Sequence, residues 1–144
     1  MKGKPPQRGS TRYRMVCLDT DILIDLLKGQ KEAIYLINKL QSEGQPLKTT
    51  MISAYELIKG SAISIKSEEN LAKVKDLLSA LPILNLNLES CEEASKIYSR
   101  LRSKGQTIGE FDILIAAIVV HNEDTLISRD THFNLIENLN LQKW

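Results

Sequence analysis

The sequence predicts an α/β fold, a three-layer α/β/α sandwich with a mostly parallel central sheet. Short apolar, β-prone runs alternate along the chain with amphipathic segments of helical periodicity. Strands separated by helices are joined by right-handed crossovers, which make the strands parallel and cover both faces of the sheet. With 144 residues and 42% hydrophobic side chains, the chain is long and apolar enough to bury the core of one such domain.

The strands and helices follow from apolar periodicity and from boundary residues. The first strand, Met15–Leu18, ends at Asp19; Asp21 is a suitable N-cap for the helix that follows, and Gly29 ends that helix. In chain order, the prediction is strand 15–18, helix 22–28, helix 32–42, strand 47–51, a helix from Ser53 that Gly60 interrupts, helix 68–81, strand 83–88, helix 89–104, helix 110–121, strand 125–128 and a short strand 139–142.

Two helix starts have the spacing of a capping box, in which an N-cap hydroxyl and an acid three residues later satisfy free backbone groups. The pairs are Ser53 with Glu56 and Thr107 with Glu110. The second pair begins the helix 110–121 and places Asp112 just past its first turn.

The most apolar segment of the chain contains one carboxylate. Nine of the ten residues from 111 to 120 are apolar, and the tenth is Asp112. A buried ionised carboxylate is costly unless a charged group or a metal compensates it. Between residues 105 and 130 the only Lys or Arg is Arg129, so the partner must come from elsewhere in the chain or from outside it.

Four acids can meet at the carboxyl edge of the predicted sheet, where parallel sheets bind their ligands. Asp19 ends the first strand, Asp130 follows the fourth, Glu56 lies on the helix after the second strand, and Asp112 lies near the start of its helix. Each acid also has a purely structural interpretation. Asp19 and Asp130 can be turn residues, and the capping box alone explains Glu56, whereas the capping role is already filled next to Asp112.

Crowded carboxylates repel one another and need cations to stay ionised. Mg²⁺ or Mn²⁺ suits them, because these ions prefer oxygen ligands. Two such ions about 4 Å apart can activate a water and stabilise the leaving oxygen in phosphodiester cleavage. Neither of the two histidines, His121 and His132, is in a ligand-pair spacing, and Cys17 and Cys91 have no zinc-site spacing.

Four blocks carry a family resemblance: M-V-C-L-D-T-D-I-L-I-D-L-L-K-G, S-A-Y-E-L-I-K-G, E-F-D-I-L-I-A-A and T-L-I-S-R-D-T-H-F. They resemble the signature blocks of PIN domains, and in particular those of the VapC toxins of prokaryotic toxin–antitoxin pairs. The resemblance covers residues 15–144. It implies a Mg²⁺- or Mn²⁺-dependent endoribonuclease whose catalytic, metal-binding acids are Asp19, Glu56, Asp112 and Asp130. It also implies a homodimer, and inhibition by a small antitoxin that inserts a segment into the acidic groove.

Three neighbours of the acids are predicted to support a carboxylate or to contact RNA: Thr20, Ser128 and Arg129. Many relatives of this kind have Thr at the position of Ser128, which keeps the hydroxyl. Arg129 stands between two site residues and is the first candidate for a phosphate contact. Further basic candidates are Lys59, Lys66, Arg100, Arg102 and Lys104.

Residues 1–14 form a basic leader with five Lys or Arg and no acid, whereas residues 15–144 carry 14 basic and 18 acidic residues, a net charge of −4. The leader is polar and rich in Pro and Gly, so we expect a disordered tail. We also expect Met15 to be the natural start, with the leader an upstream extension. The alternative is a basic arm that binds phosphates. The longest apolar runs are shorter than the roughly 20 residues that span a bilayer, so we expect a cytoplasmic protein.

Two other functions remain open from the sequence. D-T-D after a strand resembles the motif of haloacid-dehalogenase-type phosphatases, in which Asp19 is the nucleophile and Asp21 the general acid. That fold also requires a late pair of acids and a phosphate-binding lysine, for which the sequence offers no convincing match. The second alternative is a non-catalytic PIN-like module that binds RNA or protein. A binding module has no need of a self-repelling cluster of four acids.

Overall fold

The structure is a computed structural model that describes residues 15–144; the predicted basic leader, 1–14, lies outside the described residues. The strands are β2 (Val16–Leu18), β3 (Leu47–Thr50), β4 (Ile83–Leu84), β5 (Thr125–Ile127) and β6 (Asn140–Gln142). The helices are α1 (Thr20–Leu27), α2 (Lys31–Ser42), α3 (Met51–Ala62), α4 (Ser67–Ser79), α5 (Leu88–Ser103), α6 (Glu110–His121) and the short 3-10 helix η2 (Thr131–Leu135).

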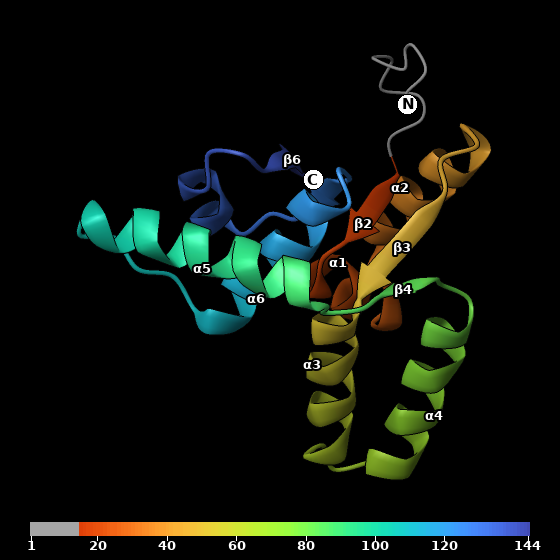
Figure 1. Cartoon of the computed structure of the whole chain (residues 1–144). Coiled ribbons are helices and arrows are strands. Elements are labelled where there is room, and N and C mark those ends of the chain that lie inside the picture. Colours follow the sequence, from red (N-terminus) through yellow and green to blue (C-terminus); the bar gives the residue numbers. More distant parts are fainter. Residues whose placement is uncertain (1–14) are drawn as a thin grey trace.

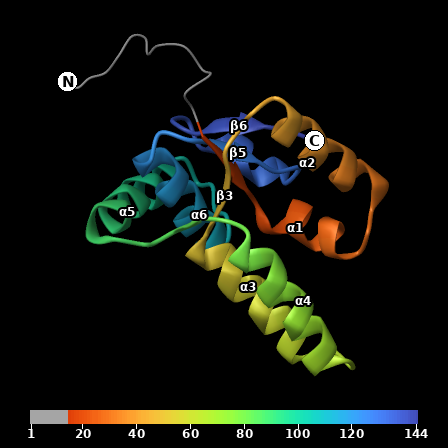
Figure 2. The same ribbon diagram turned by 90° about the vertical axis from the view of Figure 1, so that its right-hand side faces the viewer.

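The five strands form one sheet in the order β4-β3-β2-β5-β6, and each neighbouring pair is parallel. Helices α5 and α6 cover one face of this sheet, and α1 and α2 lie on the other (Figures 1 and 2). The predicted three-layer α/β/α sandwich is therefore confirmed. The sheet is parallel throughout its described strands, because a helix or the η2 turn separates each strand from the next.

The two central strands divide their side chains between two hydrophobic cores. Cys17 and Leu126, paired in register across β2 and β5, belong to the core under α5 and α6. Leu18 and Ile127, the next pair, belong to the core under α1, α2, α3 and α4. Successive residues of a strand point to opposite faces, so three-residue strands suffice to build both cores.

Helix α6 is buried on nearly all sides against α5 and the sheet. Its buried residues are Ile113, Ile115, Ala116, Ala117, Ile118 and Val119. The two alanines allow close approach, as the apolar sequence of this segment predicts. Despite this apolar character, no helix within residues 15–144 is both long and apolar enough to cross a membrane.

The predicted cap of the first helix is wrong, because α1 begins two residues earlier than expected. Its N-cap is Asp19, whose side chain makes no capping hydrogen bond, and Asp21 lies in the first turn. The carboxylate of Asp19 instead accepts a hydrogen bond from Ser128, which holds it toward β5. Neither Asp19 nor Asp21 is thus occupied in capping this helix.

Both predicted capping boxes are also wrong. Helix α3 begins at Met51, so Thr50 is its N-cap and accepts a hydrogen bond from the Ser53 backbone at 3.1 Å. Helix α6 has Gly109 as its N-cap, which leaves Thr107 outside the helix and puts Asp112 within the first turn rather than past it. Because the two helices start at other residues, neither Glu56 nor Asp112 takes part in a capping box.

Two further expectations differ from the structure. Helix α3 continues through Gly60 to Ala62, because the space around Gly60 is open and its backbone keeps a negative φ. The predicted strand 83–88 shrinks to Ile83–Leu84, since this edge strand pairs only with Thr49 and Thr50 of β3. Helices α3 and α4 pack as a hairpin that extends away from the sheet (Figures 1 and 2).

A buried ion pair between Lys48 and Asp124 yields a test of the fold. Their side chains are 11% and 3% exposed, with Lys48 Nζ 2.9 Å from Asp124 Oδ2. We expect Lys48→Met to lower the free energy of unfolding by about 3 kcal/mol, because it leaves a buried carboxylate without its cation. Urea unfolding measures this loss.

The exposed pair Lys104–Glu137 supplies the control, since Lys104→Met should cost less than about 1 kcal/mol. The double variant Lys48→Met/Asp124→Asn should lose less than the sum of its two single variants. Strictly additive losses would contradict an energetic coupling between Lys48 and Asp124.

Candidate active site

The four predicted acids meet at the carboxyl edge of the sheet. Asp19 directly follows β2, and Asp130 comes three residues after the end of β5. Glu56 lies on α3, which starts immediately after β3, and Asp112 lies in the first turn of α6. Their charges interact: the carboxylates of Asp130 and Glu56 act on Asp112, and Asp112 acts on Asp19. Parallel strands and their following helices deliver these side chains to one edge from distant parts of the chain.

Asp19 is the most buried member of the group. It is 6% exposed, and the Ser128 hydroxyl donates a 2.7 Å hydrogen bond to its Oδ2. Burial raises the pKa of Asp19 to about 7; the hydrogen bond from Ser128 opposes this rise, and the charge of Asp21 adds to it. The carboxylate therefore holds a proton close to neutral pH unless a cation stabilises its ionised form.

Asp112 is half-buried at the centre of the cluster. The pKa of Asp112 is raised to about 6, first by burial and then by the neighbouring charges of Asp130 and Glu56, while His132 lowers it. The free N–H groups of the first turn of α6 favour a negative charge there. Asp112 is thus less deeply buried than its apolar sequence context suggests, and its neighbours are acids rather than a compensating Lys or Arg.

Glu56 is held by hydroxyl groups. The hydroxyl of Thr20 donates a 2.7 Å hydrogen bond to Glu56 Oε1, and Thr20 Oγ1 lies 2.9 Å from Ser53 Oγ. Thr20 is the first residue of α1, so this contact joins α1 to α3 beside Asp19. Thr20 thus contacts a carboxylate of the cluster through its hydroxyl group.

Asp130 has a structural role as well as its place in the cluster. Its Oδ1 accepts a 2.9 Å hydrogen bond from the His132 backbone and so caps the 3-10 helix η2. The same oxygen lies 3.2 Å from His132 Nδ1. The backbone N–H of Asp130 donates to Ser128 Oγ at 3.0 Å, so Ser128 connects Asp19 with Asp130.

Several residues at this edge were not predicted from the sequence. Asp21 Oδ2 accepts a 3.0 Å hydrogen bond from the Arg129 backbone, and Asp21 Oδ1 lies 3.4 Å from Trp144 Nε1. The Arg129 guanidinium pairs with Asp25 and lies over the Trp144 ring, 4.1 Å from its centroid. Asp21 and Asp25 are four residues apart on α1, a spacing that could have indicated a shared face. Trp144 is 123 residues from Asp21 in sequence and gave no local signal.

The donor set fits a hard divalent cation. One ligand atom each from Asp112, Asp130 and His132 lies within 4.8 Å of the others. Asp19 and Glu56 add further carboxylates whose charges act in the same cluster, and carboxylate oxygens are the ligands that Mg²⁺ and Mn²⁺ prefer. A cation here would offset the burial and the repulsion that together raise the pKa of Asp112.

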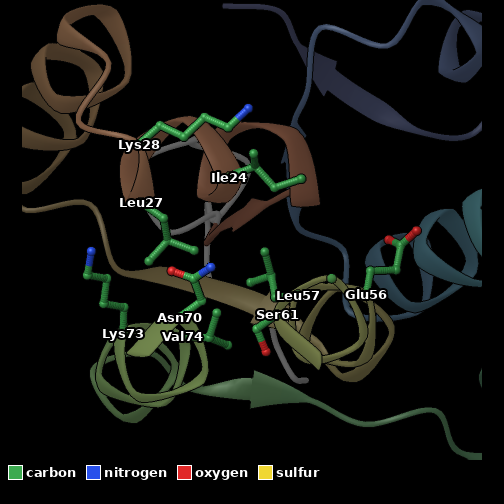
Figure 3. A pocket seen from close by; sticks show the side chains of 10 residues that line it. Ile24, Leu27, Lys28, Glu56, Leu57, Ser61, Asn70, Lys73 and Val74 are labelled. Atoms are coloured by element: carbon green, nitrogen blue, oxygen red, sulfur yellow. The ribbon is translucent and has the colours of Figure 1, made fainter. Parts of the chain in front are cut away.

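An apolar groove of about 310 Å³ adjoins the acids (Figure 3). It lies between α1 on one side and the α3–α4 hairpin on the other, with Leu27, Leu57 and Val74 among its lining side chains. Lys28 and Lys73 lie at its borders, and Glu56 belongs both to its wall and to the acidic cluster, its carboxylate pointing away from Leu57 (Figure 3). Glu56 is therefore the residue that the groove and the acidic cluster share.

The fold and site define an α/β protein with a cluster of carboxylates at the carboxyl edge of a parallel sheet. The model of the PIN domain matches residues 16–139, and the chain belongs to the PIN domain family. Among curated relatives, it is 28% identical over 128 residues to Ribonuclease VapC2 of Rickettsia felis, covering 88% of this chain and 96% of the relative. It is 24% identical over 128 residues to the tRNA(fMet)-specific endonuclease VapC of Salmonella typhimurium, with the same coverage.

Solved structures that are similar to this chain also belong to VapBC proteins. The chain is similar to VapBC2 from Rickettsia felis bound to a promoter DNA fragment, with a TM-score of 0.84, 26% identity and coverage of 90% of this chain and 98% of that one. It is also similar to VapBC-1 from nontypeable Haemophilus influenzae, with a TM-score of 0.80, 28% identity and the same coverage. The resemblance to PIN domains and VapC proteins read from the four sequence blocks is confirmed.

The raised pKa of Asp19 predicts how stability depends on pH. In the unfolded chain this carboxyl titrates near about 3.9, whereas in the folded protein its pKa is about 7. Between these values the folded state binds more protons, so the metal-free protein should lose stability as pH rises from about 4 to about 7, by at most about 4 kcal/mol. Thermal unfolding in a chelating buffer at several pH values measures this loss.

Asp19→Asn should flatten this pH dependence, and the exposed Glu92→Gln should leave it unchanged. Mg²⁺ or Mn²⁺ should raise the melting temperature more at pH 8 than at pH 5.5, because protons compete with the cation. A melting temperature of the metal-free wild type that rises steadily from pH 5 to pH 8 would contradict this assignment.

Proposed function

We propose that the protein is a Mg²⁺- or Mn²⁺-dependent endoribonuclease and the toxin of a toxin–antitoxin pair. The observation that carries the proposal is the convergence of Asp19, Glu56, Asp112 and Asp130 on one edge of a PIN domain. Its relatives support the proposal, since they are named as VapC ribonucleases and one as an endonuclease specific for a transfer RNA.

The acids would have distinct tasks in this reaction. Asp112, whose charge is coupled to those of the other three acids, would hold the cation together with them, and Glu56 on α3 would also orient the attacking water. Ser128 would fix Asp19 through its 2.7 Å hydrogen bond, and Thr20 would fix Glu56 in the same way. A bound Mg²⁺ or Mn²⁺ supplies the positive charge that acidifies the water and stabilises the leaving oxygen.

An acidic cluster needs nearby positive charge to accept a phosphate backbone. Lys59 meets this need best among the predicted basic residues: its Nζ lies 5.4 Å from the Tyr55 ring centroid and 5.5 Å from that of Phe111. These rings belong to the immediate sequence neighbours of Glu56 and Asp112. The guanidinium of Arg129 is engaged with Asp25 and Trp144, so its contact to RNA would require that pairing to open.

The groove of Figure 3 is the proposed binding site of the antitoxin. Its apolar lining between α1 and the α3–α4 hairpin suits an amphipathic segment, and its continuity with Glu56 brings that segment to the acids. The solved relatives named above are VapBC assemblies, which supports a protein partner for this chain. The homodimer that the resemblance implies stays a prediction.

The two alternatives differ in their support. A haloacid-dehalogenase-type phosphatase is disfavoured by the PIN domain match over residues 16–139, and Asp21 is engaged by the Arg129 backbone rather than placed as a free acid. A non-catalytic PIN-like module has no such evidence against it beyond the acidic cluster itself. An assay of cleavage therefore decides between catalysis and binding.

Incubation of the purified protein with a mixture of transfer, ribosomal and messenger RNA should give cleavage in Mg²⁺ or Mn²⁺ and none in EDTA. We expect Asp112→Asn to lower the cleavage rate about a hundredfold or more, because it removes the central carboxylate of the cation site. Gel analysis of the RNA with end mapping measures both. The exposed Glu92→Gln on α5 is the matched control and should keep full activity.

Cleavage that persists in EDTA or in Asp112→Asn would show that another nuclease or another mechanism is at work. RNA that binds but stays intact with every substrate class and both metals would favour the non-catalytic module. Hydrolysis of a phosphomonoester that Asp21→Asn abolishes would favour the phosphatase.

A substitution in the groove should separate inhibition from catalysis. Ile24, 37% exposed, lines the groove, and Ile34 on α2, 39% exposed, does not. We expect Ile24→Lys to weaken inhibition by a cognate antitoxin about tenfold or more, since it places a charge in an apolar contact, while RNA cleavage is kept. Titration of the antitoxin into the cleavage assay measures this. Ile34→Lys is the control, and equal loss of inhibition in both variants would contradict the groove as the antitoxin site.

A further inference from the structure

His132 is the one described nitrogen ligand that lies beside the acidic cluster. It is the second residue of η2, the short helix that follows β5 and that Asp130 caps. The His132 backbone donates to Asp130 Oδ1 at 2.9 Å, and its ring Nδ1 lies 3.2 Å from the same oxygen. The cap thus fixes both the start of η2 and the position from which the imidazole projects. The chain's other histidine, His121, is the last residue of α6.

The spacing of His132 and two of the acids suits a single ion. Its ring nitrogen and one carboxylate oxygen each from Asp112 and Asp130 all lie within 4.8 Å of one another. An ion with ligands at about 2.1 Å places ligands on opposite sides about 4.2 Å apart. The spacing in the structure therefore exceeds that of bound ligands by at most about 0.6 Å. The side chain of His132 is 63% exposed, so its ring is free to turn toward the ion.

The contact with Asp130 keeps the ring beside the carboxylates of the site, with Nδ1 3.2 Å from Asp130 Oδ1. A neutral imidazole has one ring nitrogen with a free lone pair, and this is the form that binds a metal. Among the charged groups acting on Asp112, His132 is the one that opposes the effect of the surrounding acids. The imidazole therefore lies close to the charge that an ion at this place would neutralise.

We propose that His132 is a ligand of the divalent cation held by Asp112 and Asp130, and that it makes this site prefer Mn²⁺ over Mg²⁺. Mg²⁺ takes oxygen ligands and keeps its waters, so an imidazole adds little to its binding. First-row transition ions, including Mn²⁺, gain affinity from a nitrogen donor in a mixed N/O site. This inference rests on the proposed function, because the ion is the one that the proposed nuclease would use.

The test measures the bound metal, not catalysis. Full-length protein without a histidine tag is loaded with Mn²⁺, and pulsed EPR records the ¹⁴N couplings of the bound ion. We expect a directly coordinated imidazole nitrogen in the wild type, its loss in His132→Ala and its retention in His121→Ala. The His121 control is well matched, because nine residues of α6, about 14 Å, separate it from Asp112, and the chain has only these two histidines.

Affinity supplies the second readout. Mn²⁺ is titrated by the EPR signal of the free ion, and Mg²⁺ by its competition with Mn²⁺. Removal of the imidazole in His132→Ala should weaken Mn²⁺ binding about tenfold or more and leave Mg²⁺ binding nearly unchanged. The variant His132→Gln keeps a polar side chain at the surface and should behave as His132→Ala does, with circular dichroism spectra that match the wild type.

Two outcomes would contradict the role of His132 without contradicting the proposed nuclease function. Bound Mn²⁺ without a ¹⁴N coupling in the wild type would show an all-oxygen site. Equal weakening of Mn²⁺ and Mg²⁺ in His132→Ala would show that His132 only orients Asp130. If neither ion binds the wild type more tightly than Asp112→Asn, both this inference and the proposed metal-dependent function fail.

Discussion

The hydrogen bond from Ser128 to the buried carboxylate of Asp19 ties together the carboxyl ends of the two central strands, and the whole acidic edge is arranged around it. Asp19 ends β2, and Ser128 follows β5, its neighbour in the sheet. The same hydroxyl accepts the backbone N–H of Asp130, which then caps η2. One short polar contact therefore sets where two acids lie and where the chain turns after β5.

The carboxyl edge of the sheet concentrates negative charges that repel one another. Three hydroxyl groups, from Thr20, Ser53 and Ser128, lie between or beside the carboxylates, and they accommodate the charges without neutralising them. The pKa values of Asp19 and Asp112 are raised, chiefly because Asp19 is buried and Asp112 is half-buried. Such a concentration of carboxylates suits a divalent cation, which prefers oxygen ligands.

The α3–α4 hairpin connects the acidic cluster with the apolar groove. Glu56 on α3 belongs both to the acidic cluster and to the wall of the apolar groove, so the proposed antitoxin segment would lie close to this carboxylate. At the same edge of the sheet, Trp144 and Asp25 contact the guanidinium of Arg129. The positive charge of Arg129 is therefore already paired with an acid of α1.

The sequence by itself determined the three layers and the parallel sheet, because apolar periodicity is a local property of the chain, and it indicated four acids that would lie near one edge. It misplaced the helix starts: Asp21 and Ser53 resemble caps locally, but α1 and α3 begin directly after β2 and β3. Thr107 resembles a cap as well, but α6 begins after Gly109. Only the tertiary structure decided that Trp144 lies beside Asp21 and that Arg129 pairs with Asp25. These contacts span 123 and 104 residues of sequence, and no local preference encodes them.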